Sequence, residues 1–168
     1  MLETTSSPPA RPTRLRALAP AGANTRGRRV LAALADGTSP PPPAARTLAL
    51  PPATSWAPGV ITCETAFDER LTLTPGVVFG GWIACLVDHF AGLVMLSAIP
   101  DGTGFLTAGL SVEYHAPLLP GPVTVETELT SCSTRRAVAE VRFVQRGERA
   151  CTATVEQIIH RTAGDRRA

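Results

Sequence analysis

A single carboxylate stands inside an almost wholly apolar stretch of this chain. Asp88 and the adjacent His89 lie near the middle of residues 75–99, PGVVFGGWIACLVDHFAGLVMLSAI, where the pair Gly80-Gly81 opens a helix candidate. An ionisable side chain among apolar neighbours is costly unless it is paired, solvated by a cleft or used in chemistry. A carboxylate held near a substrate can act as a general base on water or as a nucleophile.

The glycine pair offers the second part of an acyl-transfer site. The first turn of a helix leaves backbone N–H groups unpaired and carries partial positive charge. Glycines there let a carbonyl oxygen approach the backbone closely. The N–H of Gly81, together with that of Trp82, is then placed to hold an oxyanion, and one such donor contributes about 3 kcal/mol. The alternative is that Gly80 and Gly81 only permit close packing of the helix against a sheet.

Asp88 lies seven residues after Gly81, which is about 10 Å along a helix axis. At that distance the two groups cannot serve one carbonyl within one chain. The alternative for Asp88 is a structural carboxylate paired with an arginine or held by backbone N–H groups. His89 points about 100° further round the helix, so we expect it to line a pocket or to hydrogen-bond within the core.

The elements that must position these residues follow from hydrophobic periodicity. The helix is expected to begin near Gly80 and to end before Pro100-Asp101-Gly102. A helix that is apolar nearly all round must be buried in protein or in lipid. A membrane span is disfavoured, because a charge at its midpoint costs about 3 kcal/mol on insertion scales. The strands that follow also need an apolar surface to cover.

Alternating patterns predict strands on both sides of the helix, and the second half of the chain has four of them. The predicted strands are 59–67, 105–115, 123–130, 135–145 and 149–160. In the strand over 105–115 we expect one face to be formed by Leu106, Ala108, Leu110, Val112 and Tyr114. A short helix is expected over 28–35, an extended spacer over 40–43, and the start of a strand over 48–50. The sequence therefore predicts an α+β fold, in which a curved antiparallel sheet is wrapped around one long central helix.

Charge is distributed unevenly along the 168 residues. All sixteen cationic side chains are arginines, and six of them precede Val30, where Glu3 is the only acid. We expect residues 1–29 to be a disordered Arg/Pro-rich tail, residues 30–162 to form one domain, and residues 163–168 to be frayed. A basic tail on a mildly acidic body argues against a nucleic-acid-binding domain.

The four cysteines are scattered and have no histidine at metal-ligand spacing. They are interpreted as small buried side chains in a reducing cytosol, and no metal or redox cofactor is expected. The chain shows no secretory signal pattern, so a cytoplasmic location is expected. The nucleophile-elbow and phosphate-loop motifs of other enzyme classes are absent from the sequence.

The pattern VFGG–WIACLV–DHFAG, with two strands before it and SVEYHAPLLPG after it, resembles the hotdog-fold acyl-CoA thioesterases of the PaaI-like type. In that family a His-Gly-Gly triplet opens the central helix, and an Asp follows seven residues after the second glycine. Gly80-Gly81 and Asp88 match those positions, and residues 116–121 match a Pro-x-x-Pro-Gly turn. The resemblance covers about residues 30–160. Phe79 stands where the family usually has the His that helps to position the thioester carbonyl.

The resemblance implies a hotdog fold that works as a homodimer or as a dimer of dimers, which also protects a sheet edge. Asp88 of one subunit would face Gly81 of the other and act as general base or nucleophile. The implied activity is hydrolysis of an acyl-CoA or acyl-carrier thioester, with coenzyme A entering only as part of the substrate. Partners other than the substrate and the chain itself, such as nucleic acid or a membrane, are not expected.

Several further residues are predicted to bind substrate, each with a structural alternative. Phe79, Gly80, Trp82 and His89 would shape the acyl site, or belong to the core. Arg135 and Arg136 would clamp the phosphates of coenzyme A, or form a solvated turn. A second possible function, consistent with Phe79, is a non-catalytic hotdog protein that binds an acyl ligand. A dehydratase of the same fold is less favoured, because no Asp/His pair occurs in a hydratase-like order.

Overall fold

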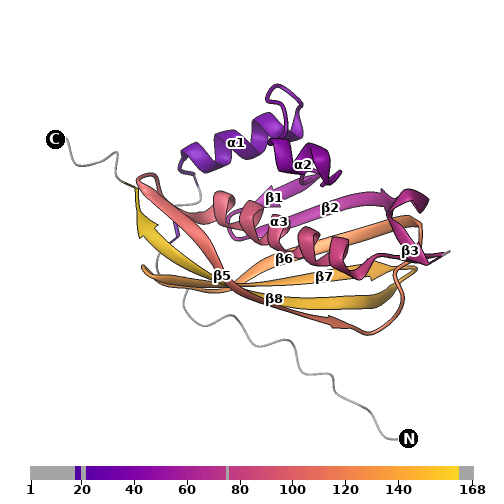
Figure 1. Ribbon diagram of the computed structural model, residues 1–168. Coiled ribbons are helices and arrows are strands. Elements are labelled where there is room, and N and C mark those ends of the chain that lie inside the picture. Colours follow the sequence, from indigo (N-terminus) through magenta and orange to yellow (C-terminus); the bar gives the residue numbers. More distant parts are fainter. Residues whose placement is uncertain (1–17, 20–21, 75, 163–168) are drawn as a thin grey trace, which may run out of the picture.

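One long helix, α3, runs across the concave side of a curved sheet (Figure 1). The computed structural model describes residues 18–19, 22–74 and 76–162, so residues 1–17 of the predicted tail and the predicted frayed end, 163–168, lie outside the described residues. The elements are α1 (Arg26–Ala35), α2 (Pro43–Thr47), β1 (Ser55–Ala57), β2 (Val60–Phe67), a 3-10 turn (Glu69–Leu71), β3 (Thr72–Thr74), β4 (Val77–Val78), α3 (Gly80–Ala98), β5 (Thr103–Tyr114), β6 (Gly121–Cys132), β7 (Arg136–Gln145) and β8 (Glu148–Arg161).

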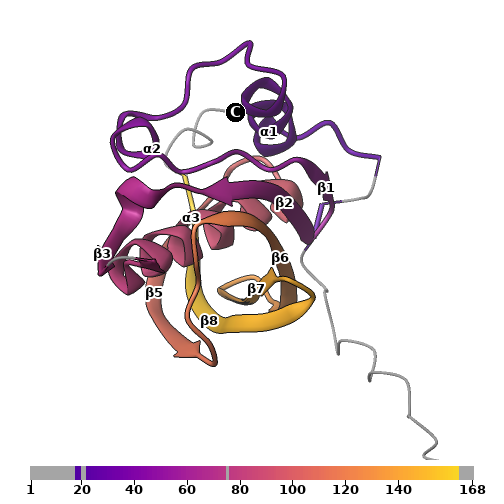
Figure 2. The same ribbon diagram turned by 90° about the vertical axis from the view of Figure 1, so that its right-hand side faces the viewer.

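The main sheet has six strands in the order β1-β2-β6-β7-β8-β5, and every pairing in it is antiparallel. Viewed near the axis of α3, the sheet curls around the helix (Figure 2). The chain order of one helix followed by four consecutive strands is as predicted, and β5 to β8 begin and end within two residues of the predicted limits. The predicted architecture of a curved sheet wrapped around a central helix is therefore confirmed.

α3 can be apolar nearly all round because other parts of the protein cover it on two sides. The sheet lies on one side and α1 and α2 lie on the other (Figure 1). By length and composition alone α3 could cross a membrane, but 61% of that apolar window is buried inside this protein. Eleven of its side chains are buried, among them Leu86, Phe90 and Val94. Burying one large aliphatic side chain contributes about 1.5–3 kcal/mol, which makes α3 the centre of the core.

α1 lies directly on α3, and two of its residues make this contact possible. A Cβ atom on Gly27 would overlap the carbonyl oxygen of Leu96, so only glycine allows this approach. Arg28 is 5% exposed. Its guanidinium donates hydrogen bonds to the carbonyl oxygens of Ser97 at 2.9 Å, Ala23 at 2.6 Å and Ala19 at 3.2 Å. The bond to Ser97 satisfies one carbonyl that the last turn of α3 leaves unpaired, and the cation there complements the helix dipole.

These contacts correct the predicted domain boundary at Val30. α1 begins at Arg26, and the Thr25 side chain caps it by accepting a hydrogen bond from the amide of Arg28. The amide of Ala19 also donates to the carbonyl of Ala98 at 2.8 Å. The packed region thus starts before residue 30. Composition suggested a tail because it does not reveal the contact of Arg28 with the carbonyl of Ser97, which lies 69 positions away.

The segment between α1 and β1 differs from the prediction as well. Residues 48–50 do not begin a strand; they follow α2, with Ala49 in the left-handed region at φ 52°. The predicted extended spacer ends in a helix instead, because Pro43 occupies the first helical position. Proline is favoured there, since its fixed φ suits a helix and its missing N–H would be unpaired anyway.

β5 departs from simple alternation through a bulge between Thr107 and Gly109. Leu106 pairs with Ile158 and is 65% exposed, whereas Leu110 pairs with Val155, which is buried. Directly paired residues share a face of the sheet. The predicted single face of Leu106, Ala108, Leu110, Val112 and Tyr114 is therefore wrong at Leu106, because the extra residue reverses the alternation.

We expect Arg28→Ala to lower the free energy of unfolding by about 2–4 kcal/mol, since it leaves buried carbonyls without donors. Arg29→Ala is the matched control: it removes one exposed bond to the carbonyl of Asn24, and should change stability by less than about 0.5 kcal/mol. Urea unfolding followed by circular dichroism measures both. Equal losses in the two variants would mean that Arg28 does not hold α1 to α3.

Candidate active site

Asp88 is an exposed residue of the otherwise largely buried α3. Its Oδ1 accepts a hydrogen bond of 2.7 Å from the hydroxyl of Thr107 on β5. Within the described residues no arginine or histidine forms an ion pair with Asp88, and no hydrogen bond engages its Oδ2. The structural alternative of a carboxylate neutralised by arginine is therefore not what this part of the chain shows.

Thr107 was missed by sequence reasoning. Uniform alternation along 105–115 predicts that Leu106 and Ala108 face the helix and that Thr107 faces away. The bulge instead puts Thr107 on the face that α3 covers, opposite the buried Gln157. The available signal was Gly109, because a glycine inside a strand pattern often marks a bulge.

A groove of about 530 Å³ runs beside Asp88, between α2, α3 and β5. Its lining is apolar except for Asp88 and His89 and the thiol of Cys85; it consists of Pro42, Ala44, Ala45, Leu48, Leu50, Ala84, Cys85, Asp88, His89 and Leu110. An accessible carboxylate in an apolar groove is the arrangement expected of a site that binds a small, mainly apolar ligand.

The amino end of α3 leaves one of the two predicted oxyanion donors without a partner in the described chain. Phe79 is the N-cap residue but supplies no side-chain cap. The amides of Trp82 and Ile83 bond to the carbonyl of Phe79, whereas those of Gly80 and Gly81 have no partner within the described chain. The N–H of Gly81 is thus available as expected, while that of Trp82 is already used by the helix at 3.0 Å.

Two aromatic side chains surround the glycine pair. A Cβ atom on Gly81 would lie 2.5 Å from the Phe79 ring, so the ring packs directly on this glycine. The hydroxyl of Tyr114 donates to the carbonyl of Gly80 at 2.6 Å. Burial, with a smaller effect from Cys151, raises the pKa of Tyr114 and keeps it a donor. Phe79 itself is 48% exposed, so it lies at the surface rather than in the core.

His89 links the groove to the backbone of the preceding segment. Its Nε2 lies 2.9 Å from the carbonyl oxygen of Pro51, which requires that Nε2 carry the proton. Burial lowers the pKa of His89 below 6.5, against the opposing effects of the Pro51 bond and the Asp88 charge. The imidazole is therefore neutral at neutral pH, and both predicted roles, pocket lining and a core hydrogen bond, apply to it.

The remaining predicted site residues lie elsewhere. Trp82 is 7% exposed and packs edge-on against Phe67, with ring centroids 5.0 Å apart, so it belongs to the core. Its indole N–H donates to the carbonyl of Leu48 at 2.6 Å. Arg135 and Arg136 lie at the start of β7, where Arg136 is 3.6 Å from Glu156. Neither lines the groove beside Asp88.

Metal and thiol chemistry find little support in residues 18–162. No cluster of three or more His, Cys, Asp or Glu side chains in the described segments could hold a metal ion. The described cysteines are free thiols, and Cys63 and Cys151 are buried. Burial raises the pKa of both to about 11, so they stay protonated and unreactive near neutral pH.

Part of this chain is similar to known proteins. The thioesterase superfamily model matches residues 75–152, which run from the segment before α3 into β8. A protein of Saccharolobus solfataricus, described as a candidate esterase, is 28% identical over 85 residues; these are 51% of this chain and 60% of that protein. The match therefore covers less than two thirds of the relative's length.

Solved structures agree on the fold. A candidate thioesterase related to phenylacetic acid degradation, from Ralstonia eutropha JMP134, has a TM-score of 0.67 at 18% identity, over 76% of this chain and 98% of that chain. A hypothetical thioesterase of Streptococcus pneumoniae, solved with coenzyme A, has a TM-score of 0.60 at 21% identity, over 66% and 85%. The hotdog fold and the resemblance to hotdog-fold thioesterases are thereby confirmed.

The lowered pKa of His89 predicts an acid-sensitive stability. As the pH falls below about 6.5, the unfolded chain binds a proton at His89 that the folded chain does not, so unfolding becomes easier. This loss cannot exceed about 1.4 kcal/mol per pH unit for one group. His89→Gln keeps a donor for Pro51 and removes the titration.

We therefore expect the melting temperature of the wild type to fall more than that of His89→Gln between pH 7 and pH 5. The difference between the two melting curves isolates His89, because all other titrating groups are shared. Parallel curves would show that His89 is not held neutral by burial.

Proposed function

We propose that this hotdog-fold protein, whose residues 75–152 match the thioesterase superfamily, hydrolyses an acyl thioester of coenzyme A or of a carrier protein. The observation that carries the proposal is Asp88: an accessible carboxylate without an ion pair in the described chain, in an apolar groove along the helix whose first turn offers a free N–H. The coenzyme A in the Streptococcus pneumoniae structure supports this class of ligand.

The chemistry follows from the two groups. The Asp88 carboxylate takes a proton from water while the water oxygen bonds to the thioester carbonyl carbon. The carbonyl oxygen becomes an oxyanion that accepts a hydrogen bond from the N–H of Gly81. Collapse of this intermediate breaks the carbon–sulfur bond, and the departing thiolate receives the proton from Asp88. Direct attack by the carboxylate, which forms a mixed anhydride that water then opens, uses the same residues.

Two subunits are required for this site. Asp88 lies seven residues after Gly81, about 10 Å along α3, so one carbonyl must bridge Gly81 of one protomer and Asp88 of another. β5 supports such an assembly: it is an edge strand of twelve residues, and Leu106, Leu110 and Tyr114 are exposed by 65%, 42% and 52%. A long apolar edge strand favours pairing with a second chain. The free buried thiols support a reducing, cytoplasmic setting.

A second function is favoured by one observation. The Phe79 ring packs on Gly81, where the family usually has a histidine, so a bound carbonyl meets a hydrocarbon ring beside its donor. If this ring keeps the thioester carbonyl away from the N–H of Gly81, the protein binds an acyl ligand without hydrolysing it. Thiol release separates the two functions, because only the hydrolase produces it.

Substitution of the carboxylate tests the proposal. Acyl-CoA thioesters from acetyl to palmitoyl are supplied, and free thiol is measured. We expect turnover by the wild type and a decrease of about 100-fold or more in Asp88→Asn, because general base catalysis contributes about 10²–10⁴-fold. Glu64→Gln, which removes an exposed carboxylate on β2, is the control and should retain full activity. Equal turnover in Asp88→Asn with the subunits still associated would remove Asp88 from the mechanism.

The two-subunit site predicts the mass of the particle and its sensitivity to charge at β5. The wild type should have at least twice the mass of the 17.6 kDa chain by light scattering. Leu106→Arg should weaken association by about tenfold or more, since a charge must then be buried at the pairing edge. Val60→Arg, at a 46% exposed position on β2, is the matched control. Activity should follow the associated fraction, and an active monomer would contradict this arrangement.

A further inference from the structure

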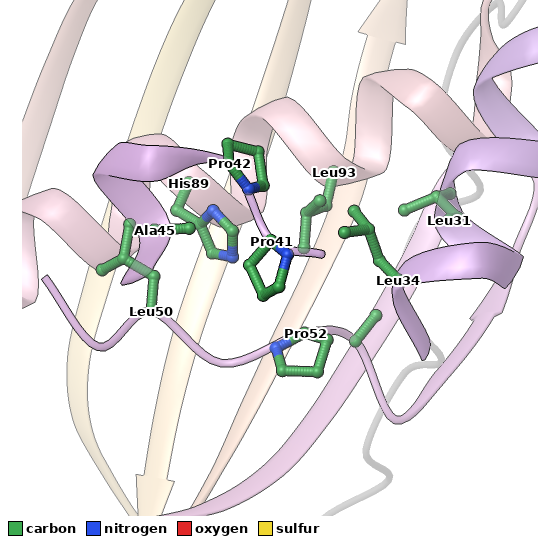
Figure 3. A pocket seen from close by; sticks show the side chains of 10 residues that line it. Leu31, Leu34, Pro41, Pro42, Ala45, Leu50, Pro52, His89 and Leu93 are labelled. Atoms are coloured by element: carbon green, nitrogen blue, oxygen red, sulfur yellow. The ribbon is translucent and has the colours of Figure 1, made fainter. Parts of the chain in front are cut away.

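A small apolar pocket lies between α1, α2 and α3, on the side of α3 away from the sheet (Figure 3). Its wall is aliphatic or proline throughout except for one imidazole; it consists of Leu31, Leu34, Pro41, Pro42, Ala45, Leu50, Pro52, Ala53, His89 and Leu93. His89 is neutral, because burial lowers its pKa. A pocket with such walls suits a hydrocarbon group and offers little to a charged one.

The pocket adjoins the groove beside Asp88. Pro42, Ala45, Leu50 and His89 line both cavities. Asp88 and His89 both line the groove, so a ligand whose reacting atom lies at the carboxylate can extend along the groove to this shared wall. Beyond the wall, Leu31, Leu34 and Leu93 lie at the α1 end of the pocket (Figure 3).

We propose that this pocket receives the hydrocarbon end of the acyl group, and that Leu31, Leu34 and Leu93 limit the substrate to short aliphatic chains. The inference rests on the proposed hydrolysis at Asp88. The pocket volume is about 40 Å³, which is about three water-sized groups. Three carbon atoms beyond the carbonyl and the carbon next to it correspond to an acyl group about as long as pentanoyl.

The segment of residues 31–53 that covers the pocket is held in place by α3 itself. The side chains of Trp82 and His89 bond to the carbonyl oxygens of Leu48 and Pro51, at 2.6 and 2.9 Å. Prolines have fixed φ angles, so ordering the proline-rich residues 40–43 and 51–52 costs little conformational entropy. Arg28 anchors α1 to the carboxyl end of α3. The pocket is therefore formed before a ligand binds, as ligand sites usually are.

The cover also lies outside the part of the chain that matches the thioesterase superfamily. That match begins at residue 75, whereas all pocket residues except His89 and Leu93 lie between 31 and 53. Acyl selectivity would thus be set largely by residues outside the segment that matches the family model. The catalytic groups and the length limit can then vary independently.

Variants of Leu34 test the pocket. Leu34 is half-buried, so substitutions there should leave the domain folded. Leu34→Ala deepens the pocket and should move the best substrate to a chain one or two carbons longer. Leu34→Trp fills it and should favour acetyl-CoA. Each methylene that leaves the pocket should lower kcat/KM by about fourfold. Val30→Ala, on α1 but outside the pocket, is the matched control and should keep the wild-type profile.

Two readouts keep the pocket and the hydrolysis apart. The first is kcat/KM across the acyl-CoA series. The second is the affinity for the same thioesters of Asp88→Asn, alone and combined with each Leu34 substitution, measured by calorimetry. Hydrolysis with one unchanged chain-length profile in the wild type and both Leu34 variants overturns the pocket and leaves the hydrolase standing. Absence of turnover, with affinities that shift with Leu34 as predicted, overturns the hydrolase and supports the pocket. If there is no turnover and the affinities do not depend on acyl chain length, both the pocket and the hydrolysis are overturned.

Discussion

The burial of α3 is the constraint on which the rest of this structure depends. An apolar helix of nineteen residues must be covered on every side. The curved sheet curls around the helix but does not enclose it (Figure 2). The opposite side is closed by α1, which Gly27 and Arg28 bring against the carboxyl end of the helix. What remains open is a narrow stripe on α3 that contains Gly81, Cys85 and Asp88. Because these residues are three or four apart, they share one helix face.

The open stripe on α3 and the edge strand β5 lie side by side, and both lack a covering partner within one described chain. β5 borders the stripe, and Thr107 and Tyr114 reach α3 from it through hydrogen bonds to Asp88 and to the carbonyl of Gly80. Its other edge has no strand to pair with in the described chain. A second copy of the chain would at once cover the stripe, pair the edge and bring Gly81 opposite Asp88. The proposed two-subunit site would therefore answer the need of a single helix that one sheet cannot enclose.

Much of the fold could be predicted because it rests on local patterns. The limits of α3 follow from Gly80-Gly81 and from Pro100-Asp101-Gly102, and the last four strands follow from alternation bounded by turn residues. The failures lie where contacts between distant residues decide. Arg28 looks like a tail residue until Ser97, 69 positions away, accepts its hydrogen bond. Leu106 looks like a core residue until the bulge at Thr107 turns it outward.

The sequence by itself determined that a lone carboxylate lies two helical turns beyond a glycine pair on a buried helix, because helix periodicity and terminal signals are properties of neighbouring residues. Only the tertiary structure decided that Asp88 is accessible and bonded to Thr107, that Phe79 covers Gly81, and that Trp82 belongs to the core. It also decided that residues between 31 and 53, together with His89 and Leu93, line an apolar pocket that adjoins the groove beside Asp88. The reason is physical: accessibility, hydrogen-bond partners and cavities depend on which elements pack together, and a chain's local pattern does not specify those contacts.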